Sequence, residues 1–177
     1  MPRGKRNNYN YYYPHRSLAV GKRNKYSTMT YYVKNGNPQA AGYKPYFTIV
    51  NPTEIGGMRK VKNISIQLSF SSLYFDPNDE QFKYIENQQI LWAIVYVPKG
   101  SEPGTLNENS GIFYTPPQFI MASGIYDCEQ PGNTSRIFTP LSRNLNAGDG
   151  IAFVYKPRQL LYDGQLSAVI NYAITLQ

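Results

Sequence analysis

The chain has 177 residues, 41% of them hydrophobic, which suffices for one domain with a buried core. Its single cysteine, Cys128, excludes an intramolecular disulfide and a zinc site built from several cysteines. Its single histidine, His15, lies in a polar segment, which excludes a catalytic triad and a histidine metal cluster. The formal net charge is +7 and is unevenly distributed along the chain.

No apolar stretch approaches the roughly 18–20 residues that span a membrane. The first 17 residues contain no apolar run after their basic residues, so we expect no signal peptide. The composition therefore predicts a soluble protein made in a reducing compartment.

The positive charge is concentrated at the start of the chain. Residues 1–62 hold 12 Lys or Arg and a single acid, Glu54, whereas residues 63–177 hold 6 basic and 10 acidic residues. A basic end joined to a mildly acidic body is typical of a protein that touches a polyanion. A solvated tail that only adds solubility is the alternative.

Residues 1–25 form the basic arm of this charge pattern. They carry little to bury apart from Leu18-Ala19-Val20, so we expect them to be largely disordered. Basic groups neutralise phosphates and aromatic rings stack on bases, which together predict binding of single-stranded nucleic acid. The alternative for the tyrosines is packing against the folded body or a neighbouring subunit. The candidate nucleic-acid-binding residues are Arg3, Lys5, Arg6, Tyr11, Tyr12, Tyr13, Arg16, Lys22, Arg23 and Lys25.

Strand patterns begin directly after the arm. Residues 26–33 and 43–50 are rich in β-branched and aromatic residues and end at turn signals. Residues 60–70 alternate strictly, with Ile64, Ile66 and Leu68 on one face and polar residues on the other. We expect residues 71–88 to form a loop, with a short helix or irregular turn around 76–84.

Residues 89–97 are apolar without alternation, which predicts a strand covered on both faces; a buried helix is the competing interpretation. Residues 99–118 are polar and contain several Pro and Gly, typical of a surface loop. Residues 118–157 then predict three strands. Between the last two lies a corner at 141–150, which we expect to be an ordered loop rather than a helix. The closing segment, 165–176, alternates as strictly as 60–70 and should lie inside a sheet.

The pattern predicts an all-β fold with a disordered basic N-terminal arm. Connections rich in Gly and Pro favour a two-sheet sandwich, most simply a single eight-stranded jelly roll over residues 26–177. The eight expected strands are 26–33, 43–50, 60–70, 89–97, 117–127, 134–140, 149–156 and 165–176.

Two segments resemble a known family. Residues 114–125 (YTPPQFIMASGI) and 140–151 (PLSRNLNAGDGI) are similar to segments of the capsid proteins of circovirus-like, Rep-encoding circular single-stranded DNA viruses. Residues 91–98 (LWAIVYVP) and the closing strand also resemble that group. The resemblance covers roughly residues 60–177.

This resemblance implies a capsid protein whose jelly roll self-assembles, in about sixty copies, into a small icosahedral shell around single-stranded DNA. It further implies a place in the virion and, during assembly, in the host nucleus. The arm departs from the family pattern because it is short, mixed in Lys and Arg, and rich in tyrosine. The resemblance implies no cofactor, and no acid cluster in the sequence indicates a metal site.

Outside the arm, Lys60 and Lys62 either extend the nucleic-acid surface or belong to an ordinary solvated strand face. In the corner, Arg143 and Asp149 are expected to form a structural pair or an interface contact rather than a catalytic one. The residues assigned to this structural and assembly corner are Arg143, Asn144, Asn146, Gly148 and Asp149.

A secreted trimeric ligand of the C1q or tumour-necrosis-factor kind is the alternative function, since Leu145–Asp149 resembles a corner found in those folds. The basic arm and the lack of a signal peptide argue against it. An enzyme is not expected, because the sequence assembles neither a metal site nor a catalytic constellation.

Overall fold

The alternating segments of the sequence form antiparallel strands. The computed structural model describes residues 26–35, 44–54, 56–76, 81–84, 89–107, 111–127, 134–157 and 163–176. The predicted arm, residues 1–25, lies outside these ranges. The strands in chain order are β1 (Ser27–Asn35), β2 (Tyr46–Val50), β3 (Arg59–Asp76), β4 (Gln81–Tyr84), β5 (Gln89–Val97), β6 (Ile120–Asp127), β7 (Thr134–Thr139), β8 (Arg143–Leu145), β9 (Gly150–Pro157) and β10 (Asp163–Leu176).

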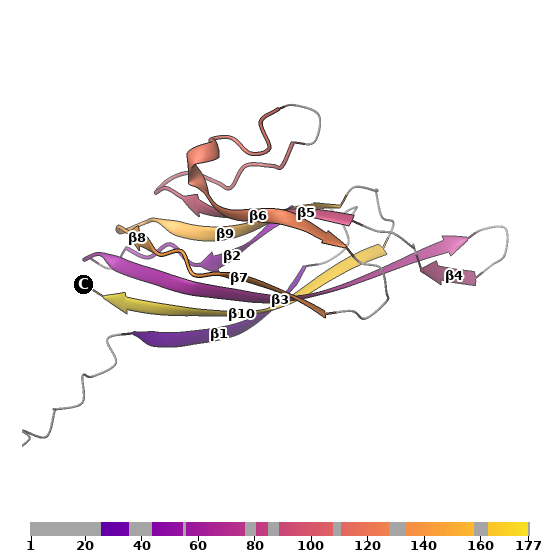
Figure 1. Cartoon of the computed structure of the whole chain (residues 1–177), viewed down its shortest axis with the longest axis horizontal. Coiled ribbons are helices and arrows are strands. Elements are labelled where there is room, and N and C mark those ends of the chain that lie inside the picture. Colours follow the sequence, from indigo (N-terminus) through magenta and orange to yellow (C-terminus); the bar gives the residue numbers. More distant parts are fainter. Residues whose placement is uncertain are drawn as a thin grey trace, which may run out of the picture.

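The strands form two antiparallel sheets that pack as a β-sandwich. The larger sheet has the order β1-β10-β3, and β3 pairs on its far side with β8, β7 and β4 in turn. The smaller sheet has the order β2-β9-β5-β6. Figure 1 shows the smaller sheet stacked on the larger one. The expectation of an all-β, two-sheet sandwich is therefore confirmed.

The core lies between the two sheets. Ile64, Ile66 and Leu68 of β3 point into it and are fully buried, as the strict alternation of this strand predicted. The smaller sheet contributes Phe153, which stacks against Phe47 at 4.9 Å and against Trp92 at 6.0 Å between ring centroids. This continuous apolar layer holds the sheets together.

Strand β10 lies between β1 and β3, so the prediction of an inner closing strand is confirmed. Its residues Leu166, Ala168 and Ile170 face the core. Opposite β10, Asn63 of β3 adopts a left-handed backbone with φ 55°, and the pairing shifts by one residue between Asn171 and Ala173. This β-bulge keeps Val61 and Ile64 both facing inward.

Each of the eight expected strands is present, and the structure corrects the segments between them. Residues 71–76 and 81–84 are not the expected loop with a short helix, because β3 continues to Asp76 and pairs with β4. Figure 1 shows this pair extending beyond the rest of the sandwich. The corner contains a short strand, β8, paired with the start of β3, and residues 117–119 form a 3₁₀ turn, Pro117–Phe119, rather than the start of β6.

Residues 99–118 are more than the expected surface loop. Leu106 and Tyr114 are both only 3% exposed and pack on Leu91, Ala93 and Val95 of β5. In Figure 1 this segment covers the side of the smaller sheet that faces away from the larger one. It explains why β5 is apolar on both faces, as the sequence predicted.

Candidate functional site

The corner before β9 is organised around the buried carboxylate of Asp149. Its Oδ2 accepts a hydrogen bond from the backbone N–H of Asn146 at 2.8 Å, and its Oδ1 accepts one from the N–H of Lys99 at 3.1 Å. Next to it, Gly148 has φ +85° and donates its N–H to Thr53 O at 2.8 Å. This left-handed conformation suits glycine and turns the chain tightly into β9.

These donors set the protonation of Asp149. Burial alone would raise the pKa of the carboxyl, but the hydrogen bonds from Asn146, Tyr96 and Lys99, with the nearby charge of Arg59, lower the pKa below its ordinary value of 3.8. Asp149 is therefore ionised at neutral pH. A carboxylate held in its charged form by surrounding donors stabilises a loop and is a poor proton acceptor.

Arg59, the first residue of β3, holds the corner in place through hydrogen bonds of its side chain. It is only 5% exposed, and its guanidinium donates to Asn51 O at 3.0 Å and to the backbone O of Asp149 at 2.7 Å. Its Nε is buried without a hydrogen-bond partner. One arginine therefore joins the start of β3, the segment after β2 and the corner before β9.

Tyr96 links Arg143 to Asp149. The Arg143 guanidinium lies 4.3 Å from the centre of the Tyr96 ring, and the Tyr96 side chain hydrogen-bonds Asp149. Burial and this carboxylate raise the pKa of Tyr96, so its hydroxyl stays protonated and donates. The expected connection between Arg143 and Asp149 thus runs through an aromatic ring. A role for Arg143 in an interface stays a prediction.

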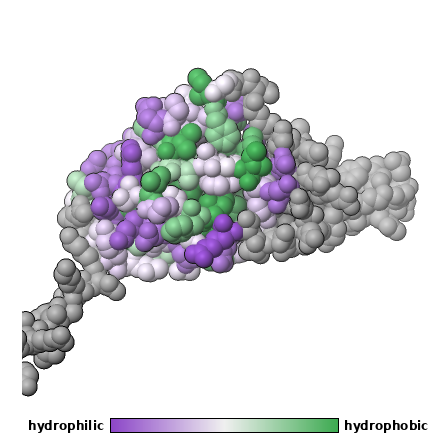
Figure 2. Space-filling model, in the orientation of Figure 1, coloured by the Kyte–Doolittle hydropathy of each residue, from purple (hydrophilic) through white to green (hydrophobic). Residues whose placement is uncertain are grey.

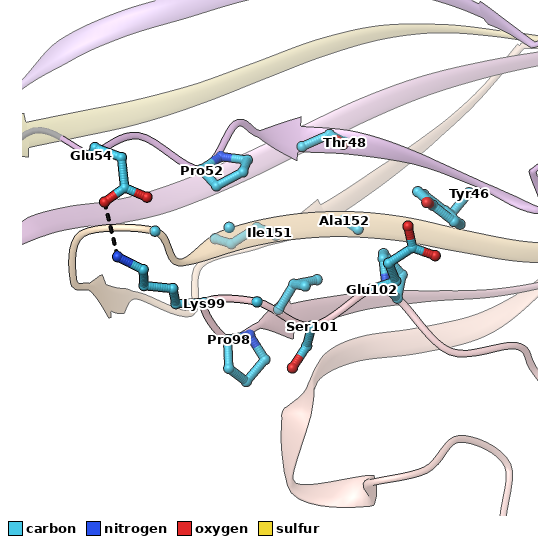
Figure 3. Close-up of a pocket in the computed structure, with 15 residues that line it drawn as sticks. Tyr46, Thr48, Pro52, Glu54, Pro98, Lys99, Ser101, Glu102, Ile151 and Ala152 are labelled. Atoms are coloured by element: carbon cyan, nitrogen blue, oxygen red, sulfur yellow. Dashed lines mark hydrogen bonds and ion pairs between the residues drawn. The ribbon is translucent and has the colours of Figure 1, made fainter.

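A pocket of about 420 Å³ lies beside this corner, between β2, the start of β9 and the segment after β5. Figure 3 shows Pro52 and Pro98 on its walls and the ion pair between Lys99 and Glu54 at its rim, where Nζ and Oε2 are 2.9 Å apart. A second lysine, Lys44, lies 3.9 Å from Glu102 Oε1. Glu54 and Glu102 are thus each paired with a lysine at an exposed position. Such surface ion pairs are typical of a structural role, and they do not form the pair of groups that acid–base catalysis needs.

The structure places the predicted site residues in separate regions. All ten candidate nucleic-acid-binding residues of the arm lie outside the described residues. In the corner, Asn144 is exposed on β8, opposite Lys60 of β3, and Asn146 contributes a backbone N–H to Asp149. Lys60 and Lys62 lie on the outer face of the larger sheet, and Lys62 Nζ is 3.8 Å from the centre of the Tyr26 ring.

A second surface feature is apolar. Ile125 on β6, Phe138 on β7 and Leu141 after β7 are 59%, 54% and 52% exposed. Strands β6 and β7 both lie at sheet edges. Figure 2 shows apolar side chains gathered in the middle of the face where these strands run in Figure 1, with hydrophilic residues around them. We call Ile125, Phe138 and Leu141 the apolar edge.

Sequence reasoning missed Arg59, Tyr96 and Lys99 in the corner. Arg59 and Val61 are two residues apart on the same strand, so their side chains lie on the same face, and Val61 faces the core. The alternation of the sequence therefore predicts an inward position for Arg59. No sequence signal tied Tyr96 or Lys99 to Asp149, because their meeting depends on how β5 and β9 pair.

Within the described ranges, no group of three or more His, Cys, Asp and Glu is placed to hold a metal ion. The described part of the chain likewise has no helix with the length and apolar character needed to cross a membrane. Comparison with known protein families and with curated proteins gave no match.

Proposed function

We propose that this chain is a viral capsid protein. It self-assembles into a small icosahedral shell and packages single-stranded DNA through its basic N-terminal arm. The folded part is a single jelly roll, and the protein acts in the virion and, during assembly, in the host nucleus. It has a structural and binding role rather than a catalytic one.

The observation that carries the proposal is the strand order. If β4 and β8 are set aside as additions to β3, eight strands remain, and they pair first with last, second with seventh, third with sixth, and fourth with fifth: β1 with β10, β2 with β9, β3 with β7, and β5 with β6. The first and third pairs lie in one sheet, the second and fourth in the other. A paired ribbon wound around a sandwich has this order, which supports a jelly roll, the fold of many viral capsid domains.

The charge distribution supports a nucleic-acid cargo. The arm, residues 1–25, carries seven Lys or Arg and no acid. It precedes β1, which is an edge strand of the larger sheet. A basic segment of this kind neutralises phosphates without reading sequence, as packaging requires.

The apolar edge supports self-assembly. Among the described residues, Ile125 and Phe138 lie on strands that pair on one side only, where exposed apolar groups invite association with another chain. Assembly of identical subunits would bury these side chains and pair them with copies of the same surface or of another.

The test is direct. Purified protein is run on size exclusion, viewed by negative-stain electron microscopy and measured for absorbance at 260 nm. Uniform shells that carry nucleic acid are expected. Stable trimers free of nucleic acid would contradict the proposal and favour the secreted ligand of the C1q or tumour-necrosis-factor kind, which shares the jelly-roll order.

Deleting residues 2–25 separates packaging from folding. We expect particles or subunits that remain folded but lose most of their nucleic acid, with a flatter dependence of binding on salt. Circular dichroism checks the fold and the ratio of absorbance at 260 and 280 nm checks the cargo. An unchanged nucleic-acid content would refute the role of the arm.

A further inference from the structure

The outer face of the larger sheet carries mostly polar side chains in regular rows across the strands, with Val169 and Phe138 as apolar members. One row runs from Tyr32 of β1 through Val169 and Gln67 to Arg136 of β7. In the next row Thr30 donates a hydrogen bond to Asn171 Oδ1 at 2.6 Å. Farther along, Arg136 Nε donates to Ser65 Oγ at 3.0 Å. These contacts lie on the side of the sheet away from the core.

This face is cationic. Lys34, Lys60, Lys62 and Arg136 all lie on it, at the positions that alternate with the buried residues of their strands. Among the side chains that the structure describes in the larger sheet there is no carboxylate. The carboxylates whose side chains it does describe lie on or beside the smaller sheet; they are Glu54, Glu102, Asp127 and Asp149.

The segregation of charge has a direct electrostatic consequence. Like charges on one face repel one another and create a positive potential above the sheet, and no carboxylate among the side chains that the structure describes there offsets it. The strands β1 and β7 are separated by β10 and β3, so their backbones are about 14 Å apart and Lys34 and Arg136 stand at opposite borders of the face. The face is wide enough to attract a linear polyanion at several points.

Aromatic rings accompany the cations. Tyr32 is 62% exposed in the centre of the β1 edge. Tyr26, the first described residue after the arm, lies beneath the ammonium group of Lys62. Exposed rings among cations on an open sheet give bases a surface on which to stack, a sequence-tolerant mode of binding single strands. Duplexes offer no free base faces to such rings.

We propose that the outer face of the larger sheet is a second binding site for single-stranded nucleic acid, continuous with the arm. The sites are joined covalently at residues 25–26, so a strand held by the arm reaches Lys60, Lys62 and Tyr32 without leaving the protein surface. Phosphates bind the lysines and Arg136, and a base stacks on Tyr32. This inference rests on the proposed function and names the ordered surface that the cargo contacts.

The first experiment uses the full chain and a short fluorescein-labelled oligodeoxythymidine, with anisotropy measured over a series of salt concentrations. The slope of log K against log salt is negative, and each phosphate contact to a single strand contributes about 0.7 to its magnitude. The double variant Lys60→Gln with Lys62→Gln should therefore reduce that magnitude by about 1.4. The matched control, Lys44→Gln with Lys156→Gln, removes the same charge from β9 and from the segment just before β2, and should leave the slope at the wild-type value.

The second experiment tests stacking. Tyr32→Ala should weaken oligodeoxythymidine binding by about fivefold or more at fixed salt and leave the salt slope unchanged, because the ring contributes through the base and not through charge. Tyr32→Phe keeps the ring and should restore the affinity. Ultraviolet crosslinking should join the oligonucleotide to the peptide that contains Tyr32 as well as to the arm.

Each other outcome overturns the inference. If both lysine double variants behave alike and crosslinks are confined to residues 1–25, the arm binds alone; the proposed function then still stands. If the Lys60 and Lys62 variant loses particles while its affinity for the oligonucleotide is unchanged, the face contacts another copy of the chain. If the wild-type chain binds no oligonucleotide, the proposed packaging function falls together with this inference.

Discussion

At the scale of single residues, Asp149 determines the geometry of the corner. Its two carboxylate oxygens accept hydrogen bonds from segments that are far apart in sequence, and its backbone oxygen accepts one from Arg59. Buried charged groups are stabilising only when each is satisfied in this way. The corner therefore depends on a full set of donors rather than on one ion pair.

We expect Asp149→Asn to lower the free energy of unfolding by about 1–3 kcal/mol at neutral pH, because the amide presents a donor to one of two backbone N–H groups. Folding lowers the pKa of Asp149 below 3.8, so the carboxylate stabilises the protein at pH values above that and loses its effect as the pH falls through the lower, folded pKa. The difference between variant and wild type should therefore shrink in acid.

Urea unfolding followed by emission of Trp92, the single tryptophan, measures this difference at several pH values. Asp127→Asn, an equal charge change at an exposed position on β6, is the control and should alter stability by no more than about 0.5 kcal/mol. A difference for Asp149→Asn that stays constant down to about pH 2 would show that the carboxylate is not the group responsible.

At the scale of elements, the contact between β5 and β6 is unusually close at Gly124. A Cβ built on Gly124 would lie 2.8 Å from Cζ2 of Trp92, its partner on β5. Trp92 in turn stacks on Phe153 of β9 in the core. Glycine at this position lets an edge strand lie flat against a large ring.

Gly124→Ala should therefore displace β6 or rotate the indole, and lower stability by about 1–3 kcal/mol through overpacking. The maximum of Trp92 emission should shift, since the ring loses its position on Phe153. Ser123→Ala, the neighbouring exposed position on the same strand, is the control and should leave both stability and emission close to wild type. If Gly124→Ala behaves like this control, β6 is free to move and the close contact is not a constraint.

Elements with a strong local pattern were predictable. Strands 60–70, 89–97 and 165–176 follow from alternation or from continuous apolar residues, and their bounds moved by at most a few residues except where β3 continues. The continuation of β3 to Asp76 was not readable, because it depends on pairing with β4, a strand of four residues. β8 has three residues and forms because the start of β3 offers a free edge.

The segment 99–118 shows a second limit of prediction from the sequence. Its Pro, Gly and polar content describes a loop correctly, but its burial depends on the outer apolar face of β5, which the loop covers with Leu106 and Tyr114. The continuous apolar pattern of β5 required some cover on its second face, and the sequence did not say which segment supplies it. In the candidate site the contacts of Tyr96 and Lys99 with Asp149 were likewise not predictable from the sequence, because they form only when β5 pairs with β9.

At the scale of the whole molecule, the surface divides into regions of different character. The larger sheet turns outward a face that carries Lys34, Lys60, Lys62 and Arg136, and Phe138 lies at the β7 border of this face, where Arg136 Cζ is 6.0 Å from the centre of its ring. The smaller sheet is covered by its own loop, and Ile125 and Leu141 lie beside β6 and β7, which pair on one side only within the described residues. In a closed shell each subunit needs one surface for cargo and another for its neighbours. This division gives the proposed function a structural basis that can be tested one surface at a time.

The apolar edge should control assembly without controlling folding. Burying an isoleucine or leucine side chain contributes about 1.5–3 kcal/mol, so Ile125→Ser combined with Leu141→Ser should raise the protein concentration needed for particles by at least about tenfold. Both side chains are more than half exposed in the single subunit, so the urea midpoint should hardly change.

Ile112→Ser is the matched control, because Ile112 is 53% exposed but lies in the segment that covers the smaller sheet. Light scattering against protein concentration reports assembly for all three proteins. Equal losses in the edge variant and in the Ile112 control would mean that assembly responds to apolar area in general, and wild-type assembly by the edge variant would remove β6 and β7 from the interface.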